Sequence, residues 1–167
     1  MKTIIIYTSS NNCTQRAVRE LSQKLTGEVQ AIDIKHSYNQ NLDDFDRIVV
    51  GGSIRGQKTM HRINQFYMNY MLVLRTKEIG LFLCSSGDLV LAQEEIKFAF
   101  PEELHQLAKT EAIFTGQIDA GSMSLLKKFF IGKISGLRDK ESILDQEAID
   151  LFASQMDRTY HPFLLLI

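Results

Sequence analysis

The fold can be inferred from Lys2-Thr3-Ile4-Ile5-Ile6-Tyr7-Thr8-Ser9-Ser10-Asn11-Asn12-Cys13-Thr14, in which an apolar run leads into a polar loop. The run up to Tyr7 shows almost no polar alternation, which is typical of a strand covered on both faces in a parallel sheet. Beyond the loop, apolar residues recur at helical spacing as far as Leu25, and Gly27 ends the helix. This stretch therefore predicts a strand, a loop and a helix.

The same alternation of apolar strands and amphipathic helices continues along the chain. Further strands are predicted at Val29–Ile34, Arg47–Gly52, Ile79–Cys84 and Ala112–Gly116, and helices around Ile63–Leu74, Leu89–Ala108 (interrupted near Pro101), Leu125–Ile134 and Asp145–Met156. Strands that alternate with helices predict a single α/β domain over residues 1–167, with helices on both faces of a parallel sheet. Right-handed crossovers favour five strands in the order 2-1-3-4-5.

Composition and charge exclude several classes of protein. Acidic and basic residues nearly cancel, giving a formal net charge of -1, whereas a nucleic-acid binder usually carries a basic excess. The two cysteines, Cys13 and Cys84, have no CxxC spacing and no histidine beside them, so no metal site is predicted. No signal peptide opens the chain, and no segment approaches the roughly 20 apolar residues that span a bilayer. We therefore expect a cytoplasmic protein.

The loop after the first strand has the properties of an anion-binding site. In sheets of this strand order, ligands bind where the order reverses, at the carboxyl ends of the first and third strands. The loop leads into a helix N-terminus, which favours phosphate, and no acidic residue occurs from Met1 to Arg19. Ser9, Ser10 and Thr14 add hydroxyl donors. The alternative is a hydroxyl-rich helix cap without a ligand.

Known motifs narrow the identity of this loop. It has neither the Gly-Lys-Ser/Thr of a Walker loop nor GxGxxG, and without acidic residues it cannot serve a signalling receiver. The segment Ser9-Ser10-Asn11-Asn12-Cys13-Thr14 resembles the phosphate loop of the flavodoxins, usually written Ser/Thr-x-Thr-Gly-x-Thr. Asn11 replaces a hydroxyl and Asn12 replaces the glycine. Asparagine is the non-glycine residue best suited to a left-handed backbone, so the turn can survive.

The resemblance to flavodoxins extends to two further strand ends. The third strand ends in Gly51-Gly52-Ser53-Ile54-Arg55-Gly56, similar to the Gly-x-Ser-Ile-Arg of a subgroup that includes menaquinone-dependent protoporphyrinogen oxidases. The fourth ends in Cys84-Ser85-Ser86-Gly87-Asp88, where flavodoxins hold one edge of the isoalloxazine ring. The resemblance implies a flavodoxin-like three-layer sandwich with FMN as its cofactor. The implied cofactor-binding residues are Ser9, Ser10, Asn11, Asn12, Cys13, Thr14, Ser53, Ile54, Arg55, Gly56, Cys84, Ser85, Ser86, Gly87 and Asp88.

Two functions are consistent with this resemblance. The first is an FMN-dependent oxidoreductase related to protoporphyrinogen oxidase, which takes electrons from an unknown small molecule and passes them to a quinone or a redox partner protein. Acidic residues between Ser85 and Thr110 would not attract the carboxylates of a porphyrin. The second is an electron carrier, disfavoured by the near-neutral charge and by loops without aromatic residues. No residue is a convincing acid or base, so no catalytic residue is predicted.

The cysteines and the helix at Ile63–Leu74 have simple structural interpretations. Cys13 and Cys84 follow the first and fourth strands, with the third between them, so they should lie about 10 Å apart laterally. We therefore expect packing residues beside the cofactor rather than a disulfide. His61 and Arg62 are expected to form a solvent-exposed first helical turn. The following residues are expected to form core: Met60, Phe66, Tyr67, Tyr70 and Met71.

Two segments leave a surface role open. The basic, amphipathic Leu125–Ile134 could lie on a membrane surface, where a quinone would be found, although a helix packed on the sheet is favoured. The apolar tail Phe163–Ile167 could contact a membrane or a second copy of the chain in a homodimer.

Overall fold

The computed structural model describes residues 1–9, 12–35, 38, 40–53, 57–85, 89–115 and 146–158. One parallel sheet contains β1 (Lys2–Thr8), β2 (Glu28–Asp33), β3 (Arg47–Ser53), β4 (Glu78–Ser85) and β5 (Ala108–Thr115). The strand order is β2-β1-β3-β4-β5, which confirms the predicted topology. The order reverses between β1 and β3, so the polypeptide after β1 lies at the predicted ligand-binding position.

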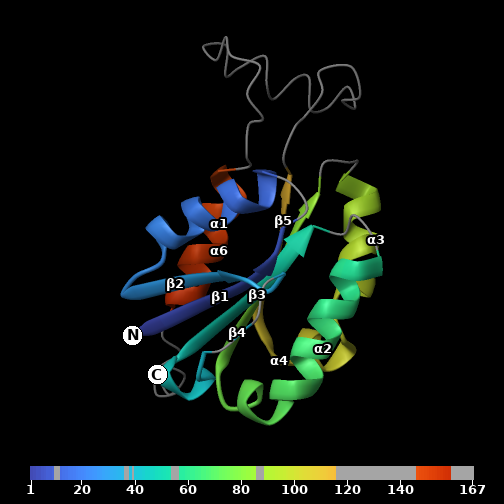
Figure 1. Ribbon diagram of the computed structural model, residues 1–167. Helices are drawn as coiled ribbons and strands as arrows, with labels where there is room; N and C mark the ends of the chain where they lie inside the picture. Colours follow the sequence, from blue (N-terminus) through green and yellow to red (C-terminus); the bar gives the residue numbers. More distant parts are fainter. Residues whose placement is uncertain are drawn as a thin grey trace, which may run out of the picture.

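Helices cover both faces of the sheet (Figure 1). One face carries α1 (Asn12–Lys24) and α6 (Gln146–Asp157), and the other carries α2 (Gln57–Leu74), α3 (Leu89–Ala99) and α4 (Glu102–Leu107). A short 3-10 helix, η1 (Leu42–Asp44), was not predicted; the side chain of Asn41 caps it by accepting from the backbone of Asp43 at 3.2 Å. The three-layer arrangement agrees with the sequence-based expectation.

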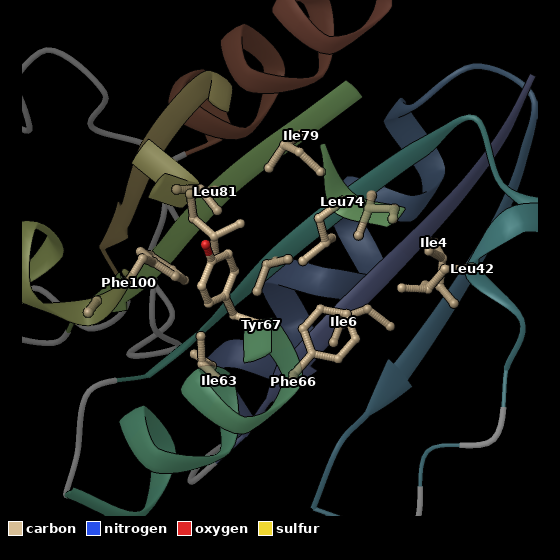
Figure 2. Close-up of a cluster of buried hydrophobic side chains, with 14 of the residues drawn as sticks. Ile4, Ile6, Leu42, Ile63, Phe66, Tyr67, Leu74, Ile79, Leu81 and Phe100 are labelled. Carbon is tan, nitrogen blue, oxygen red and sulfur yellow. The ribbon is translucent and has the colours of Figure 1, made fainter. Parts of the chain in front are cut away.

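Side chains of β1 alternate between two hydrophobic clusters. Ile4 and Ile6 lie in one cluster with residues of α2 such as Phe66, as Figure 2 shows, while Ile5 packs with residues of α1 and α6. Because both faces are covered, β1 needs apolar residues in succession, which explains the unbroken run seen in the sequence. The described stripe on α2 is core as predicted: Phe66 and Tyr67 are buried, and Tyr70 and Met71 are partly buried against the same cluster.

Some element boundaries differ from the prediction. Strand β5 begins at Ala108 rather than Ala112, because its first residues pair with β4 next to a register shift at Ile79/Gly80. Helix α2 begins at Gln57, before the expected start at His61, whereas α6 agrees with the predicted helix. The predicted helix at 125–134 and the apolar tail at 163–167 lie outside the described residues.

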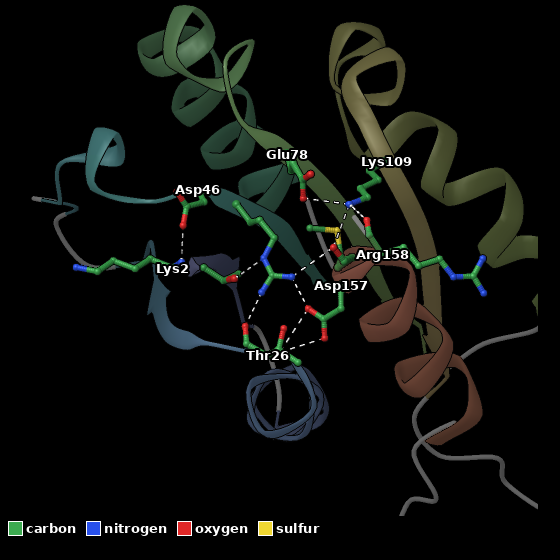
Figure 3. A network of polar contacts seen from close by, with 10 residues as sticks. Lys2, Thr26, Asp46, Glu78, Lys109, Asp157 and Arg158 are labelled. Atoms are coloured by element: carbon green, nitrogen blue, oxygen red, sulfur yellow. Dashed lines mark hydrogen bonds and ion pairs between the residues drawn. The ribbon is translucent and has the colours of Figure 1, made fainter. Parts of the chain in front are cut away.

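A fully buried arginine lies near the amino end of β3. The Arg47 guanidinium donates to Thr3 Oγ1 at 2.8 Å, to the Thr26 carbonyl at 2.6 Å and to the Met156 carbonyl at 3.3 Å, and it pairs with the Asp157 carboxylate. These groups belong to β1, to the segment after α1, and to the end of α6 (Figure 3). Arg47 therefore links α6 to the sheet, at the end of the sheet opposite the predicted cofactor loops.

Candidate functional site

The carboxyl ends of β1, β3 and β4 form the candidate site. Backbone pairing places Thr8 beside Gly52 and Ser53 beside Cys84, so the three predicted loops leave the sheet from adjacent positions. The last polar residues of the strands are buried: Ser53 is 3 % exposed and Ser85 is 8 % exposed. The structure thus brings together the strand ends that sequence reasoning assigned to one site.

Part of the predicted site can be located residue by residue. The described members are Ser9, Asn12, Cys13, Thr14, Ser53, Cys84 and Ser85. The predictions for Ser10, Asn11, Ile54, Arg55, Gly56, Ser86, Gly87 and Asp88 fall outside the described residues. The described members all lie at the carboxyl ends of β1, β3 and β4 or in the first turn of α1.

The N-terminus of α1 suits an anion. The helix begins at Asn12, which is exposed, and its first turn contains no acidic residue. The backbone N–H groups at a helix N-terminus and the helix dipole favour negative charge there, as the sequence predicts. The partly exposed Arg16, one turn along, adds positive charge on the same helix.

Sequence reasoning missed an acidic residue beside the loop. Asp33, the last residue of β2, accepts a 2.6 Å hydrogen bond from the hydroxyl of Ser9, which is 1 % exposed. Burial, together with the negative charge of Asp33, raises the pKa of Tyr7. The strand order could have revealed Asp33, because β2 lies beside β1 and its carboxyl end therefore adjoins the loop. Asp33 was missed because only residues 1–19 were considered as sources of acidic side chains.

Lys35 offsets the charge of Asp33. Its backbone N–H donates to the Asp33 carboxylate at 3.0 Å, and its ammonium lies 3.5 Å from the Ser9 hydroxyl oxygen. The side-chain amide of Gln15 lies at the same distance from that oxygen. The Ser9 hydroxyl donates its proton to Asp33, so in this arrangement it holds the loop against the end of β2. The ammonium of Lys35 brings positive charge next to the same hydroxyl oxygen.

The glycines at the end of β3 have a packing role that sequence reasoning did not assign. A Cβ on Gly51 would lie 2.3 Å from the Phe82 ring, and one on Gly52 would lie 2.6 Å from the Thr8 carbonyl oxygen. These distances are far below van der Waals contact. The close approach of neighbouring strands therefore requires glycine at positions 51 and 52.

The two cysteines lie closer together than predicted. The thiols of Cys13 and Cys84 are free and lie within hydrogen-bonding reach of each other. The estimate of about 10 Å lateral separation is wrong because it counted strands alone. Helix α1 crosses the sheet and contacts β4 as well as β1, which carries Cys13 over β3.

The described residues contain neither a candidate metal site nor a helix suited to crossing a membrane. No group of three histidine, cysteine, aspartate or glutamate side chains in the described ranges could hold a metal ion. Likewise, none of the helices in that part of the chain combines the length and apolar character needed to cross a membrane.

Comparison with known proteins identifies the family. A family model described as the flavodoxin domain matches residues 4–145. The chain belongs to the flavodoxin domain family. Membership of this family implies FMN as the cofactor and makes the chain a flavodoxin-like protein involved in electron transfer, which agrees with the fold and the cofactor that the sequence predicts. The protoporphyrinogen oxidase subgroup is a finer assignment and stays a prediction.

Solved structures of flavodoxins share the fold. A flavodoxin of Streptococcus pneumoniae TIGR4 superposes with a TM-score of 0.57 at 12% sequence identity, covering 93% of this chain and 97% of that chain. Oxidised flavodoxin 1 from Bacillus cereus gives a TM-score of 0.55 at 16% identity with the same coverage. No curated protein matches the sequence. At these identities, the superpositions establish the fold and nothing finer.

The described residues fit the phosphate end of FMN. The helix N-terminus supplies donors without a first-turn acid, and Lys35 lies beside the Asp33 carboxylate that Ser9 contacts. Ser53 and Ser85 place small polar side chains at the adjacent strand ends, where a planar ring needs donors without bulk. The donor set therefore has the chemistry that a phosphate and a flavin edge require.

Proposed function

We propose that the protein binds FMN at the carboxyl ends of β1, β3 and β4 and acts as an oxidoreductase related to protoporphyrinogen oxidase. The observation that carries the proposal is the N-terminus of α1, which has no first-turn acid and begins at the switch point of the sheet. Ligands of doubly wound sheets bind at this point. The resemblance of Gly52-Ser53-Ile54-Arg55 supports the subgroup.

In this proposal each strand end has a separate task. Backbone N–H groups of the first turn of α1, from Asn12 to Thr14, would hold the phosphate, with Lys35 supplying positive charge nearby. Ser53 and Ser85, with the loops that follow them, would hold the ring. The bound flavin supplies the redox chemistry, and the protein positions it and sets its electrostatic surroundings.

The surface beyond the third loop argues against a porphyrin as the substrate. Glu94 and Glu95 on α3, and Glu102 and Glu103 on α4, are all exposed. These side chains lie on helices that follow β4 in the chain, where Glu94 pairs with Lys97 at 2.8 Å. Repulsion disfavours a ligand with several carboxylates. We therefore propose a substrate that carries fewer negative charges than a porphyrin.

A one-electron carrier is the second candidate, and family membership favours it, since flavodoxins typically transfer electrons to redox partner proteins. The sequence of the second and third loops contains no aromatic residue that could stack on the flavin. This composition supports the oxidoreductase over the carrier.

Contact with a membrane surface through residues 125–134, where a quinone would be met, stays a prediction because this segment lies outside the described residues.

An anaerobic reductive titration of the FMN-loaded protein separates the two candidates. We expect a single two-electron transition, because the loops lack the aromatic stacking that tunes one-electron steps in carriers. The absorption spectrum recorded at each addition of reductant is the measurement. Two well-separated one-electron transitions would favour the carrier and contradict the oxidoreductase. A purified protein that takes up no FMN would contradict both.

A further inference from the structure

The thiols of Cys13 and Cys84 meet beneath the candidate site. Cys13 lies in the first turn of α1, and Cys84 lies next to the last residue of β4. Both belong to the hydrophobic cluster between the sheet and helices α1 and α6, and the two side chains are hydrogen-bonded to each other. The sequence contains no other cysteine. Two cysteine side chains that are neighbours in one cluster, with no third cysteine to compete for either, are candidates for a disulfide.

The two thiols differ in exposure and acidity. Cys84 is 4 % exposed, whereas Cys13 is partly exposed. The hydrogen bond from Cys84 lowers the pKa of the Cys13 thiol to about 7; burial opposes the shift, and the positive charge of Arg16 assists it. The same hydrogen bond, with burial, raises the pKa of Cys84. Cys13 is therefore the nucleophile that a reagent from solvent can reach, and Cys84 is the second thiol within reach of it.

We propose that Cys13 and Cys84 are a redox-active pair that forms a reversible intramolecular disulfide by exchange with a low-molecular-weight disulfide such as oxidised glutathione. The Cys13 thiolate attacks one sulfur of that disulfide, forming a mixed disulfide and releasing one thiolate. That thiolate takes the proton of the Cys84 thiol, and Cys84 attacks the Cys13 sulfur and expels the second thiolate. The protein loses two electrons and two protons, and the reagent is reduced to two thiols.

This bridge would join the two segments that flank the candidate site. It would tie the first turn of α1 to the carboxyl end of β4, next to the loops after β1 and β4. The exchange chemistry needs no flavin, because the added disulfide is the oxidant. The proposal therefore goes beyond the proposed function and can hold whether or not FMN is bound.

The test is disulfide exchange followed by mass spectrometry on the full, folded chain. The protein is incubated at pH 7 with oxidised and reduced glutathione in varied ratio, quenched with an alkylating agent and weighed intact. We expect a species lighter by two hydrogen atoms that takes no alkyl group, yields a peptide linking Cys13 to Cys84, and reverts with dithiothreitol. Circular dichroism of the oxidised sample should match that of the reduced sample.

Two serine variants identify the order of attack. Cys84→Ser keeps a hydroxyl donor beside Cys13 and should accumulate the mixed disulfide, because no second thiol is left to resolve it. Cys13→Ser should form the adduct about ten times more slowly, since Cys84 is buried and protonated. Equal rates in the two variants, adducts without a bridge in the wild type, or a bridge that forms only with loss of circular dichroism would overturn the proposal.

Discussion

Replacing Arg47 with methionine should lower the free energy of unfolding by about 3–5 kcal/mol, the cost of breaking a buried ion pair. The side chain of Arg47 is 0% exposed, and that of Asp157 is 20% exposed. Arg47→Met leaves the carboxylate of Asp157 and the carbonyl of Thr26 without their guanidinium donor. It also removes a link between α6 and the sheet (Figure 3). Urea unfolding followed by circular dichroism measures the difference.

The matched control is another ion pair that involves α6. Lys24 and Asp150 join α1 to α6, with side chains 29% and 58% exposed. Because water screens such a pair, Lys24→Met should cost at most about 1 kcal/mol. If Arg47→Met costs no more than Lys24→Met, then Arg47 does not anchor α6 as the structure indicates.

The cost of losing Arg47 should also depend on pH. Burial raises the pKa of Asp157, but hydrogen bonds from Arg47 and Thr26 outweigh burial, and the net pKa is lowered. A carboxyl group with a lowered pKa stabilises the fold above the ordinary aspartate pKa of about 4, and that contribution is lost as the pH falls through the folded-state value. The difference between wild type and Arg47→Met should therefore be largest near neutral pH and shrink in acid.

Substitution of Gly51 by alanine should destabilise the protein by about 2–3 kcal/mol through overpacking. Gly51 pairs with Phe82 across β3 and β4, and the added Cβ would lie 2.3 Å from the ring. The ring cannot move aside, because Phe82 is fully buried and stacked on Phe114 with ring centroids 5.2 Å apart. Thermal and urea unfolding of the variant measure the effect.

A second substitution separates this clash from a general effect of the new residue. Phe82→Leu removes Cε1 and Cζ, two of the three ring atoms nearest to the added Cβ, so the double variant should lose less stability than the sum of the two single losses, by about 1 kcal/mol or more. Ala31→Val, at an exposed position of β2, adds bulk to a strand without a clash and should change stability by less than about 0.5 kcal/mol. Additive losses would show that Gly51 and Phe82 do not compete for the same space.

The fold could be predicted because its signals are local and repeated. Each central strand is covered on both faces, so its apolar run is visible in the sequence, and the helices between strands leave few topologies. The start of β5 was missed because a register shift beside Ile79 lets Ala108 pair, and no local pattern encodes that shift. Arg47 was predicted within a buried strand, but its burial depends on partners from distant parts of the chain.

The candidate site was predictable in position but less so in its contacts. The strand ends and the helix N-terminus follow from topology, and family membership agrees with the cofactor that the loop resembles. Asp33 was missed because the search for acids stayed within one segment, although the predicted strand order already placed β2 beside β1. The contact between Cys13 and Cys84 was missed because it depends on the direction in which α1 crosses the sheet.

The central claim is that FMN binds with its phosphate at the N-terminus of α1, and the direct measurement is fluorescence titration of the flavin-free protein with FMN and with riboflavin. We expect FMN to bind about 100-fold more tightly than riboflavin, because only FMN carries the phosphate. Asn12→Asp should weaken FMN about tenfold without affecting riboflavin, since an acid at this position repels phosphate but stabilises the helix. Asn69→Asp, exposed on α2, makes the same charge change elsewhere and should have no effect. Equal affinities for FMN and riboflavin, or equal effects of the two variants, would contradict the account.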